Sequence, residues 1–308
     1  MTKFTIGCDP EIFVKDSKGA VSAHNMVPGT KKEPAKVEEG MIQVDGMALE
    51  FGIDPIDLLN ENVYNGLVMR DLFSKRVGKV VGILKAEAKK TNPNVVFNIS
   101  PVQDFSEEVM SAAPEEAKEL GCDPDYNAYT LEPNPRPDGT AVNFRTASGH
   151  IHIGWGADIP VDHPDHMKIC ADFVKVMDVF VGLFMTIIDY DPRRRILYGK
   201  AGAFRPKSYG VEYRTPSNMW LTTNARRKMI YTLTSYAVTF HRQGYTILSQ
   251  TGMRPEDIQT FINNGDYRAA YDTLMYVFDR LGWRTQLLTQ EFNARVKHEA
   301  STAVATAA

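Results

Sequence analysis

The chain has 308 residues, of which 43% are hydrophobic and 24% are charged, and its formal net charge at pH 7 is −3. This length and composition can bury a sizeable core, in one large domain or two small ones. The negative net charge argues against a general polyanion-binding surface, although local basic clusters remain compatible with it.

The cysteines and the absence of a targeting signal predict a soluble, cytoplasmic protein. Cys8, Cys122 and Cys170 lie far apart without metal-type spacing, as is typical of reduced thiols. Residues 1–7 are too polar and too short for a signal peptide. The most apolar run, residues 179–188, is too short to span a bilayer, and we expect it to form a buried core helix.

The first half of the chain predicts short strands around one helical region. A turn signal at 16–19 indicates that a strand over 3–15 leads into a hairpin. Apolar residues at helical spacing predict a helix over 56–90. Residues 27–40 and 101–140 are rich in Pro, Gly and charged residues, so we expect a mobile loop and a long surface insertion. Further strands are expected at 41–45, 48–53 and 94–99.

The second half of the chain predicts one further strand and several long helices. The strand covers 147–156, and the helices are expected at 162–189, at 223–242 and, as two or three segments, over 255–298. The strands are polar on one face, which favours an antiparallel sheet with one face open to solvent or ligand and helices on the other. We therefore expect an α+β fold with a single domain over 1–300 and a disordered tail over 301–308.

Acidic residues on the N-terminal strands are the first candidates for chemistry. Asp9 and Glu11 are two residues apart and share a strand face, where two carboxylates repel each other unless a cation lies between them. Asp45 precedes a Gly turn, and Glu50 stands in an apolar run, where carboxylates are rare unless paired or metal-bound. Taken singly, the first pair is also compatible with a solvated edge strand, and Glu50 is also compatible with an exposed position on an amphipathic strand.

His150 and His152 form the second candidate feature. The two imidazoles share one face of a strand, with Ile151 and Ile153 on the other face. Histidines at this spacing can bind a metal or donate to phosphate oxygens. The sequence lacks both a Cys partner and the helical His-Glu-x-x-His pattern of zinc enzymes.

A basic segment between residues 193 and 214 is the third feature. Glu212 and Arg214 alternate with apolar neighbours on one strand, so both point to the same face. The segment lacks a P-loop and a Gly-x-Gly-x-x-Gly motif, so a nucleotide would be held by its arginines. The alternative interpretation is a nucleic-acid patch or a solvated loop. The basic residues are Arg193, Arg194, Arg195, Lys200, Arg205, Lys207 and Arg214.

Together these features indicate one site with hard oxygen ligands and few nitrogen donors. Such a set suits Mg²⁺ or Mn²⁺ better than Zn²⁺. The arginines supply countercharge for phosphates, and divalent metal with arginine is the usual equipment of phosphoryl transfer.

The order of these motifs resembles the glutamine synthetase-like carboxylate-amine ligases, which include glutamate-cysteine ligases, and most of all the phage-type COOH-NH2 ligase type 2 (amidoligase) family. The resemblance covers roughly residues 5 to 220. It rests on Gly7 to Val14, Asp45 with Glu50-Phe51-Gly52, Gly149 to Gly154, Tyr198 to Arg205 and Tyr209 to Arg214.

The resemblance implies a curved antiparallel sheet with helices on its convex face and a funnel-shaped site on its concave face. It also implies two or three divalent cations, Mg²⁺ or Mn²⁺, between ATP and an acid substrate. Glu11 and Glu50, assisted by Asp45, would ligate one cation, and Asp9, His150 and Glu212 would ligate the other. Glutamine synthetases have a glutamate where this chain has Asp9, so a shorter side chain must reach the metal there.

The resemblance also assigns the remaining site residues. His152 would contact a nucleotide phosphate, and Arg205 and Arg214 would act in catalysis by stabilising the γ-phosphoryl group during its transfer. Arg195 would hold phosphate or a substrate carboxylate, and Lys200 would belong to the nucleotide-binding residues. Because the first candidate strand begins within ten residues of Met1, we expect no counterpart of the separate N-terminal domain of glutamine synthetase, and the shared-site ring of that enzyme is not implied.

The function expected from this resemblance is ATP-dependent amide formation through an acyl phosphate, in the host cytoplasm if a phage encodes the chain. The partners would be a small-molecule or peptide carboxylate and an amine, with no role for a membrane. One alternative is a metal-dependent phosphotransferase acting on amino or guanidino groups. The other is a non-catalytic phage structural or nucleic-acid-binding protein that uses the basic segment.

Overall fold

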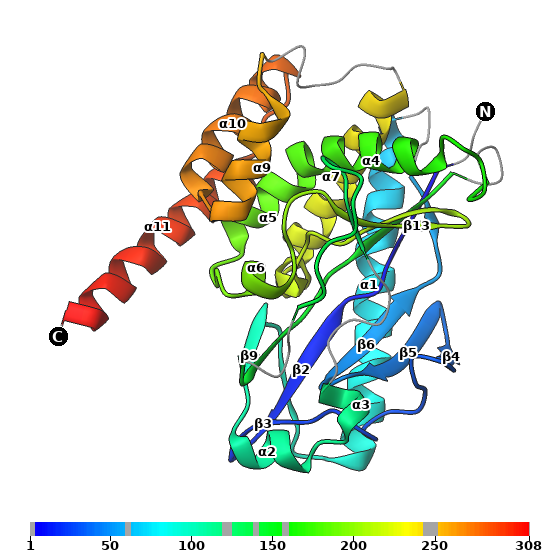
Figure 1. Cartoon of the computed structure of the whole chain (residues 1–308), viewed down its shortest axis with the longest axis vertical. Coiled ribbons are helices and arrows are strands. Elements are labelled where there is room, and N and C mark those ends of the chain that lie inside the picture. The colour runs from blue at the N-terminus through cyan, green and yellow to red at the C-terminus, as the bar shows by residue number, and fades with distance from the viewer. Residues whose placement is uncertain are drawn as a thin grey trace.

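The computed structural model describes residues 4–58, 63–118, 125–137, 142–155, 160–242 and 252–307. Within these ranges the predicted α+β class is confirmed, because antiparallel sheets are combined with many helices (Figure 1). Cys122, Gly156, Ala308 and parts of the helix and insertion expected over 56–90 and 101–140 lie outside the described residues.

The first sheet has the strand order β10-β13-β14-β12-β1-β7, and its strand pairs are antiparallel. It brings together strands from both halves of the chain. They are β1 (Thr5–Cys8), β7 (Ile56–Asp57), β10 (Tyr126–Asn127), β12 (Ile151–Gly154), β13 (Ala203–Lys207) and β14 (Gly210–Tyr213).

The second sheet is built from the first hundred residues, in the order β3-β2-β6-β5-β4 with β8 also paired to β2. The hairpin expected at the 16–19 turn is present as β2–β3. The strands are β2 (Glu11–Asp16), β3 (Gly19–Val21), β4 (Ala35–Val37), β5 (Gly40–Asp45), β6 (Ala48–Ile53) and β8 (Val96–Asn98). A separate pair consists of β9 (Val102–Asp104) and β11 (Phe144–Thr146).

The chain crosses from the first sheet to the second at Asp9 and Pro10, so the strand expected over 3–15 is in fact two strands. Pro10 lacks the N–H that a continuous ladder needs. Backbone hydrogen bonds nevertheless join the sheets here, from Asp9 N to His150 O (3.4 Å) and from Glu11 N to Ser148 O (3.0 Å). Side chains from both sheets therefore lie close together at this crossing.

The helices cover the sheets and one another. Helix α1 packs on β5, β6 and α7, and α4 packs on β13, β14 and α7 (Figure 1). Residues buried at helical spacing in α1, from Phe73 to Ala88, explain why one side of it faces the core. The helices are α1 (Val63–Thr91), α2 (Glu107–Ala112), α3 (Glu115–Lys118), α4 (His166–Met177), α5 (Leu183–Ile188), α6 (Arg194–Leu197), α7 (Asn224–Arg242), α9 (Pro255–Asn264), α10 (Tyr267–Arg280) and α11 (Gln286–Ala307).

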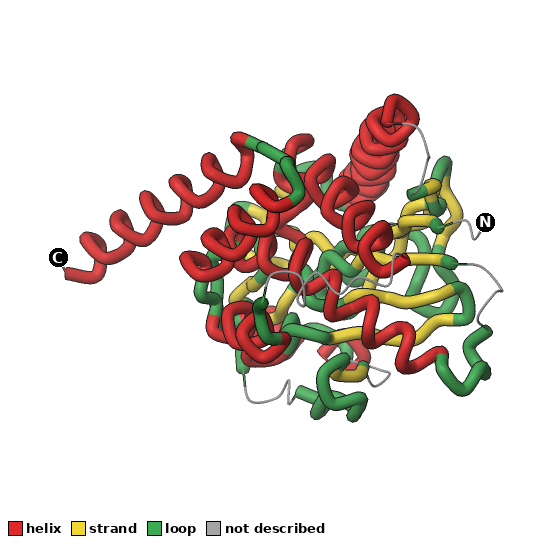
Figure 2. Tube along the Cα trace, turned by 90° about the horizontal axis from the view of Figure 1, so that it is seen from above, coloured by secondary structure: helices red, strands yellow, loops and turns green. Residues whose placement is uncertain are grey.

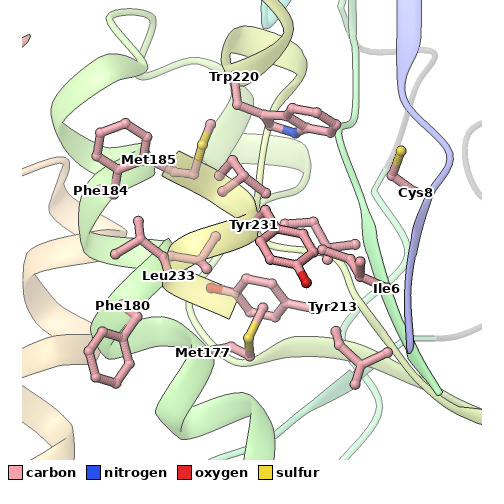
Figure 3. Packing of buried hydrophobic residues seen from close by; sticks show 14 of the residues in the cluster. Ile6, Cys8, Met177, Phe180, Phe184, Met185, Tyr213, Trp220, Tyr231 and Leu233 are labelled. Carbon is pink, nitrogen blue, oxygen red and sulfur yellow. The ribbon is translucent and has the colours of Figure 1, made fainter. Parts of the chain in front are cut away.

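The expected 162–189 helix is interrupted by the π-helical turn η2 (Asp178–Gly182), which joins α4 to α5. This turn lies within the main hydrophobic core. Figure 3 shows Met177 and Phe180 in the same cluster as Tyr213 of β14, Ile6 of β1 and Tyr231 of α7. The segment expected to form a buried helix at 179–188 is indeed buried, and Asp178 just before it accepts a hydrogen bond from Tyr213 of β14, the strand that carries Glu212.

Helix α11 projects from the rest of the molecule in both views (Figures 1 and 2). It continues to Ala307, so residues 301–307 belong to this helix. Within the described part of the chain, none of the helices has the length and apolar character that crossing a membrane would require.

Candidate functional site

The crossing point between the sheets carries two groups of acidic and histidine side chains. Asp9, His152 and Glu212 form the first group, which we call the histidine cluster. The second group, the carboxylate cluster, consists of Glu11, Asp45 and Glu50. In each group, one potential ligand atom from every residue lies within 4.8 Å of the others.

Strand register builds the histidine cluster. His152 on β12 stands opposite Glu212 on β14 on one side and opposite Gly7 on β1 on the other side. Asp9 follows Gly7 by two residues. The Nε2 atom of His152 is 3.0 Å from Oδ2 of Asp9. The shorter carboxylate at Asp9 therefore reaches this group.

His150 adjoins the histidine cluster. Its Nδ1 atom is 3.4 Å from Oδ1 of Asp9 and 3.3 Å from Oε1 of Glu212. Burial, assisted by the charge of Arg214, lowers the pKa of His150 to about 4, so its ring is neutral near pH 7. Both histidines thus face the carboxylates of Asp9 or Glu212. The resemblance assigned His150 to the metal and His152 to phosphate, whereas the group of three potential ligands contains His152.

Glu212 is the most buried acid of the histidine cluster, with 1% exposure, and three cationic side chains converge on it. Arg214 contacts its Oε1 atom, while Arg205 Nη1 and Lys207 Nζ lie 3.3 and 2.9 Å from Oε2. Burial alone would raise the pKa of Glu212, but Arg214 and the histidines bring that pKa below its ordinary value. With Asp9 in the same cluster and Asp125 3.4 Å from Nε of Arg214, the three cations are balanced by three carboxylates.

The carboxylate cluster lies on the second sheet. Glu11 and Glu50 face each other across β2 and β6, and Gln43 Nε2 donates to Glu50 Oε2 at 2.7 Å. Ser148 N donates to Glu11 Oε2 at 2.9 Å. Burial and then the negative charge of Asp45 raise the pKa of Glu11 to about 7. Such crowding of like charges is relieved when a cation binds between the carboxylates.

A cavity of about 720 Å³ opens beside the carboxylate cluster. Glu11, Asp45 and His150 line the end near the cluster, and Arg145 and Ser148 also belong to its wall. Its volume lies in the range of roughly 300–1,000 Å³ that is usual for small-molecule sites.

The residues of both clusters fit divalent cations of the Mg²⁺ type. Their donors are mainly carboxylate oxygens, which such ions prefer, and the imidazoles are compatible with Mn²⁺. Asp9 Oδ1 is buried with only the long 3.4 Å contact to His150 Nδ1, so this oxygen is available to a ligand.

Two of the expected nucleotide-binding residues lie apart from the clusters. Arg195 is close to Asp189 and to Gly265, at the end of α9. Lys200 has an exposed side chain, and its carbonyl accepts a hydrogen bond from Thr215 Oγ1 at 2.9 Å. The assignment of Arg195 and Lys200 to phosphate stays a prediction.

The rest of the basic segment is engaged within the protein. Arg193 pairs with Asp104 and Asp191. Arg194 is 2% exposed, and its guanidinium donates to the carbonyls of Thr215 and Pro216 at 2.8 and 2.9 Å. With Arg205, Lys207 and Arg214 directed at Glu212, this arrangement gives little support to a nucleic-acid patch.

Sequence reasoning missed several residues that complete the site. Asp125, from the expected surface insertion, lies 3.4 Å from Nε of Arg214. Tyr209, in the turn between β13 and β14, contacts Nδ1 of His152 through its hydroxyl. The only sequence signal for a role of Tyr209 was its position just before the strand that carries Glu212 and Arg214. Lys31, from the expected mobile loop, pairs with Asp45.

Comparison with known protein families places the second half of the chain. Residues 141–293 match the model of a protein family described as phage phiEco32-like COOH.NH2 ligase-type 2. The matched segment includes both histidines, Arg205, Glu212 and Arg214, whereas Asp9 and the carboxylate cluster precede it. No curated protein matches the chain.

Proposed function

Because the chain belongs to the phage phiEco32-like COOH.NH2 ligase-type 2 family, we propose that it is an enzyme that joins a carboxylate to an amine with consumption of ATP. The observation that carries this proposal is the neighbourhood of Glu212. This buried carboxylate, on which three cations converge, belongs to one of the two groups of potential metal ligands at the sheet crossing.

The proposed reaction has two steps. A carboxylate oxygen of the acid attacks the γ-phosphorus of ATP, the bond to the β-phosphate oxygen breaks, and ADP leaves. The neutral amine then attacks the acyl carbon, phosphate departs with the electron pair of the broken C–O bond, and the amine nitrogen loses a proton. The products are an amide, ADP and phosphate.

The residues at the histidine cluster are suited to the phosphate end of this reaction. Arg214 and Arg205 would neutralise charge on the γ-phosphoryl group as it moves, and Lys207 stands beside them. Asp125 and Glu212 hold the Arg214 guanidinium from two sides. Such fixed charges need no reorganisation during the transfer.

Asp9, His152, Glu212 and the adjoining His150 would hold one divalent cation, and Glu11, Asp45 and Glu50 would hold another. Bound cations would supply countercharge and orientation for the phosphate oxygens. Ser148 N and Gln43 Nε2 keep two of these carboxylates in place.

The cavity beside the carboxylate cluster would take the acid substrate. The two sheets joined at Asp9 and Pro10 would correspond to the curved glutamine synthetase-like sheet, within one catalytic domain over 1–300. The cytoplasm, where ATP and Mg²⁺ are abundant, is the compartment that fits this chemistry.

The test is the isosteric variant Glu212→Gln, with Glu108→Gln on the exposed surface of α2 as the matched control. The purified proteins are incubated with Mg-ATP and an amino-acid pool, and ADP and product masses are measured. We expect the Glu212 variant to lose about a hundredfold or more of the ADP formation. Full activity in that variant would exclude the proposed role of Glu212.

Product masses separate the proposal from its alternative. A dehydrative mass gain identifies an amide, whereas a stable phosphorylated product identifies a phosphotransferase. Absence of ADP formation by the wild type with every acid and amine tested would argue for a non-catalytic role.

A further inference from the structure

Asn218 is a buried amide that connects the two clusters of the site. It is fully buried and begins the 3₁₀ turn η3 (Asn218–Thr222), four residues after Arg214. Its Nδ2 atom donates to the backbone carbonyl of Glu11 at 2.8 Å. The donor thus belongs to the segment that continues from Glu212 and Arg214, while the acceptor belongs to the carboxylate cluster.

The same segment also holds the strand that carries the histidines. Gly149 N donates to the carbonyl of Pro216, and Trp220 Nε1 donates to the carbonyl of Gly149, both at 3.0 Å. Gly149 directly precedes His150. One short piece of chain therefore fixes the backbone beside His150 and beside Glu11.

The backbone of Glu11 depends on contacts from outside its own sheet. Its N–H donates to the carbonyl of Ser148 at 3.0 Å, and its carbonyl accepts from Asn218. Pro10, immediately before it, lacks an N–H with which to extend a strand ladder. The Asn218 amide thus supplies the donor that a neighbouring strand supplies elsewhere in a sheet.

The direction of the Glu11 backbone matters because Asp9 is only two residues away. Cα atoms at this separation are at most about 7 Å apart. The carboxylates of Asp9 and Glu11 nevertheless belong to different clusters. A small rotation at Glu11 therefore changes the spacing between the two groups of ligands, and the hydrogen bond from Asn218 opposes such a rotation.

Stability alone does not explain an asparagine at this position. The Oδ1 atom of Asn218 is buried and has no hydrogen-bond partner among the described residues. A buried acceptor without a partner destabilises a fold. The amide is therefore useful for its donor to Glu11, and Asn218→Leu, which keeps a similar volume, removes the unpaired acceptor together with that donor.

We propose that Asn218 is a positioning residue that acts through Glu11 and fixes the separation of two divalent cations, one at each cluster. The inference rests on the proposed function, which supplies the two cation sites, and deepens it by naming what holds those sites in register. Without the Asn218 donor, Glu11 shifts relative to Asp9. The carboxylate cluster then binds its cation more weakly, while the histidine cluster keeps its affinity.

The experiment is a titration with Mn²⁺ followed by electron paramagnetic resonance, without ATP or substrate. Neighbouring Mn²⁺ ions broaden each other's spectrum, so the measurement reports both occupancy and separation. We expect the wild type to bind two ions with a broadened spectrum. Asn218→Leu is expected to bind one ion normally and the other about 10- to 100-fold more weakly, the usual effect of removing a group that supports a metal ligand.

Tyr231→Phe is the matched control. It removes another hydrogen bond from a buried side chain to a backbone carbonyl, that of Tyr231 Oη to Asp57 O at 2.8 Å, outside both clusters. Both affinities and the broadened spectrum should be unchanged in this variant. Wild-type affinities and spectrum in a folded Asn218→Leu protein would overturn the proposal. Equal losses in both variants would also overturn it, since a general loosening of the fold would explain them.

A crystal structure of the wild type with Mn²⁺ decides if Asn218→Leu does not fold. Two bound ions with the hydrogen bond from Asn218 to Glu11 intact would support the proposal. Two bound ions with this hydrogen bond broken would contradict it.

Parallel measurement of ADP formation keeps the two proposals distinguishable. A wild type that forms no ADP with any acid and amine tested, yet binds two ions in an Asn218-dependent way, would refute the ligase and leave the two-cation site. Normal ADP formation by the wild type, together with unchanged Mn²⁺ binding in Asn218→Leu, would refute only the role of Asn218.

Discussion

Nζ of Lys31 lies 2.8 Å from Oδ2 of Asp45, so an ammonium group stands at the rim of the carboxylate cluster. Lys31 is half-exposed, and its loop also contributes to the wall of the cavity. A divalent cation bound by Asp45 must compete with this ammonium.

The variant Lys31→Met is therefore expected to bind Mn²⁺ more tightly than the wild type. Exposed ion pairs contribute about 0–1 kcal/mol, so the gain should reach at most about fivefold. Mn²⁺ titration followed by electron paramagnetic resonance measures it, and Lys36→Met, which removes an exposed ion pair with Asp54, is the control. Weaker Mn²⁺ binding by Lys31→Met would show that Lys31 supports the site.

Tyr209 provides a second prediction because its hydroxyl contacts Nδ1 of His152, while Nε2 of the same ring faces Asp9. The hydroxyl fixes the orientation of the imidazole. Groups that orient a metal-binding histidine usually change metal affinity by about 10- to 100-fold when they are removed. We expect Tyr209→Phe to weaken Mn²⁺ binding toward the lower end of this range, with little change in melting temperature.

The control for this prediction is Tyr276→Phe on α10, which removes another half-exposed hydroxyl that is hydrogen-bonded to Arg280. Unchanged Mn²⁺ affinity in Tyr209→Phe would mean that His152 is oriented by Asp9 alone.

The part of the site that sequence analysis could predict depends on strand periodicity. His150 with His152, and Glu212 with Arg214, are two residues apart, and each pair does face the same cluster. The α+β class and most helices likewise follow from local apolar spacing. These features require no knowledge of distant contacts.

The remaining residues depend on contacts between distant segments. Strand periodicity places Asp9 and Glu11 on one face, but the crossing at Pro10 sends them to different clusters. Only the family resemblance implied that the two residues would belong to different metal sites. Asp125 and Arg145 belong to segments whose local sequence suggests loops, and their places in the site come from sheet pairing and burial. No short sequence pattern encodes that geometry.

Asp178 supports the strand of Glu212 from below and leads to a prediction about pH. It is fully buried in the π-helical turn and accepts hydrogen bonds from Tyr213 Oη at 2.6 Å and Tyr129 Oη at 2.9 Å. Burial outweighs these donors and raises the pKa of Asp178 from 3.8 to about 7. Between these values the folded chain binds the proton more tightly than the unfolded chain, so this contribution to stability is lost as pH rises.

The variant Asp178→Asn lacks this titration. The unfolding free energy of the wild type relative to the variant should therefore fall from about pH 5 to about pH 7 and then level off. Urea unfolding at a series of pH values measures the difference. A difference that stays constant over this interval, or grows with pH, would contradict the raised pKa.

Gly149 precedes His150 and gives the sharpest steric prediction. A Cβ atom at Gly149 would lie 2.3 Å from Ser217 O and 2.4 Å from Trp220 Nε1, the group that donates to Gly149 O at 3.0 Å. Gly149→Ala must therefore displace this backbone and His150 with it, at a cost of about 1–3 kcal/mol. Gly82→Ala, on the exposed side of α1 with no atom within 4 Å of the new Cβ, should instead stabilise the chain by up to about 1 kcal/mol. Urea unfolding and Mn²⁺ titration of both variants test this contrast, and equal effects of the two substitutions would show that the backbone at Gly149 yields without disturbing the histidine cluster.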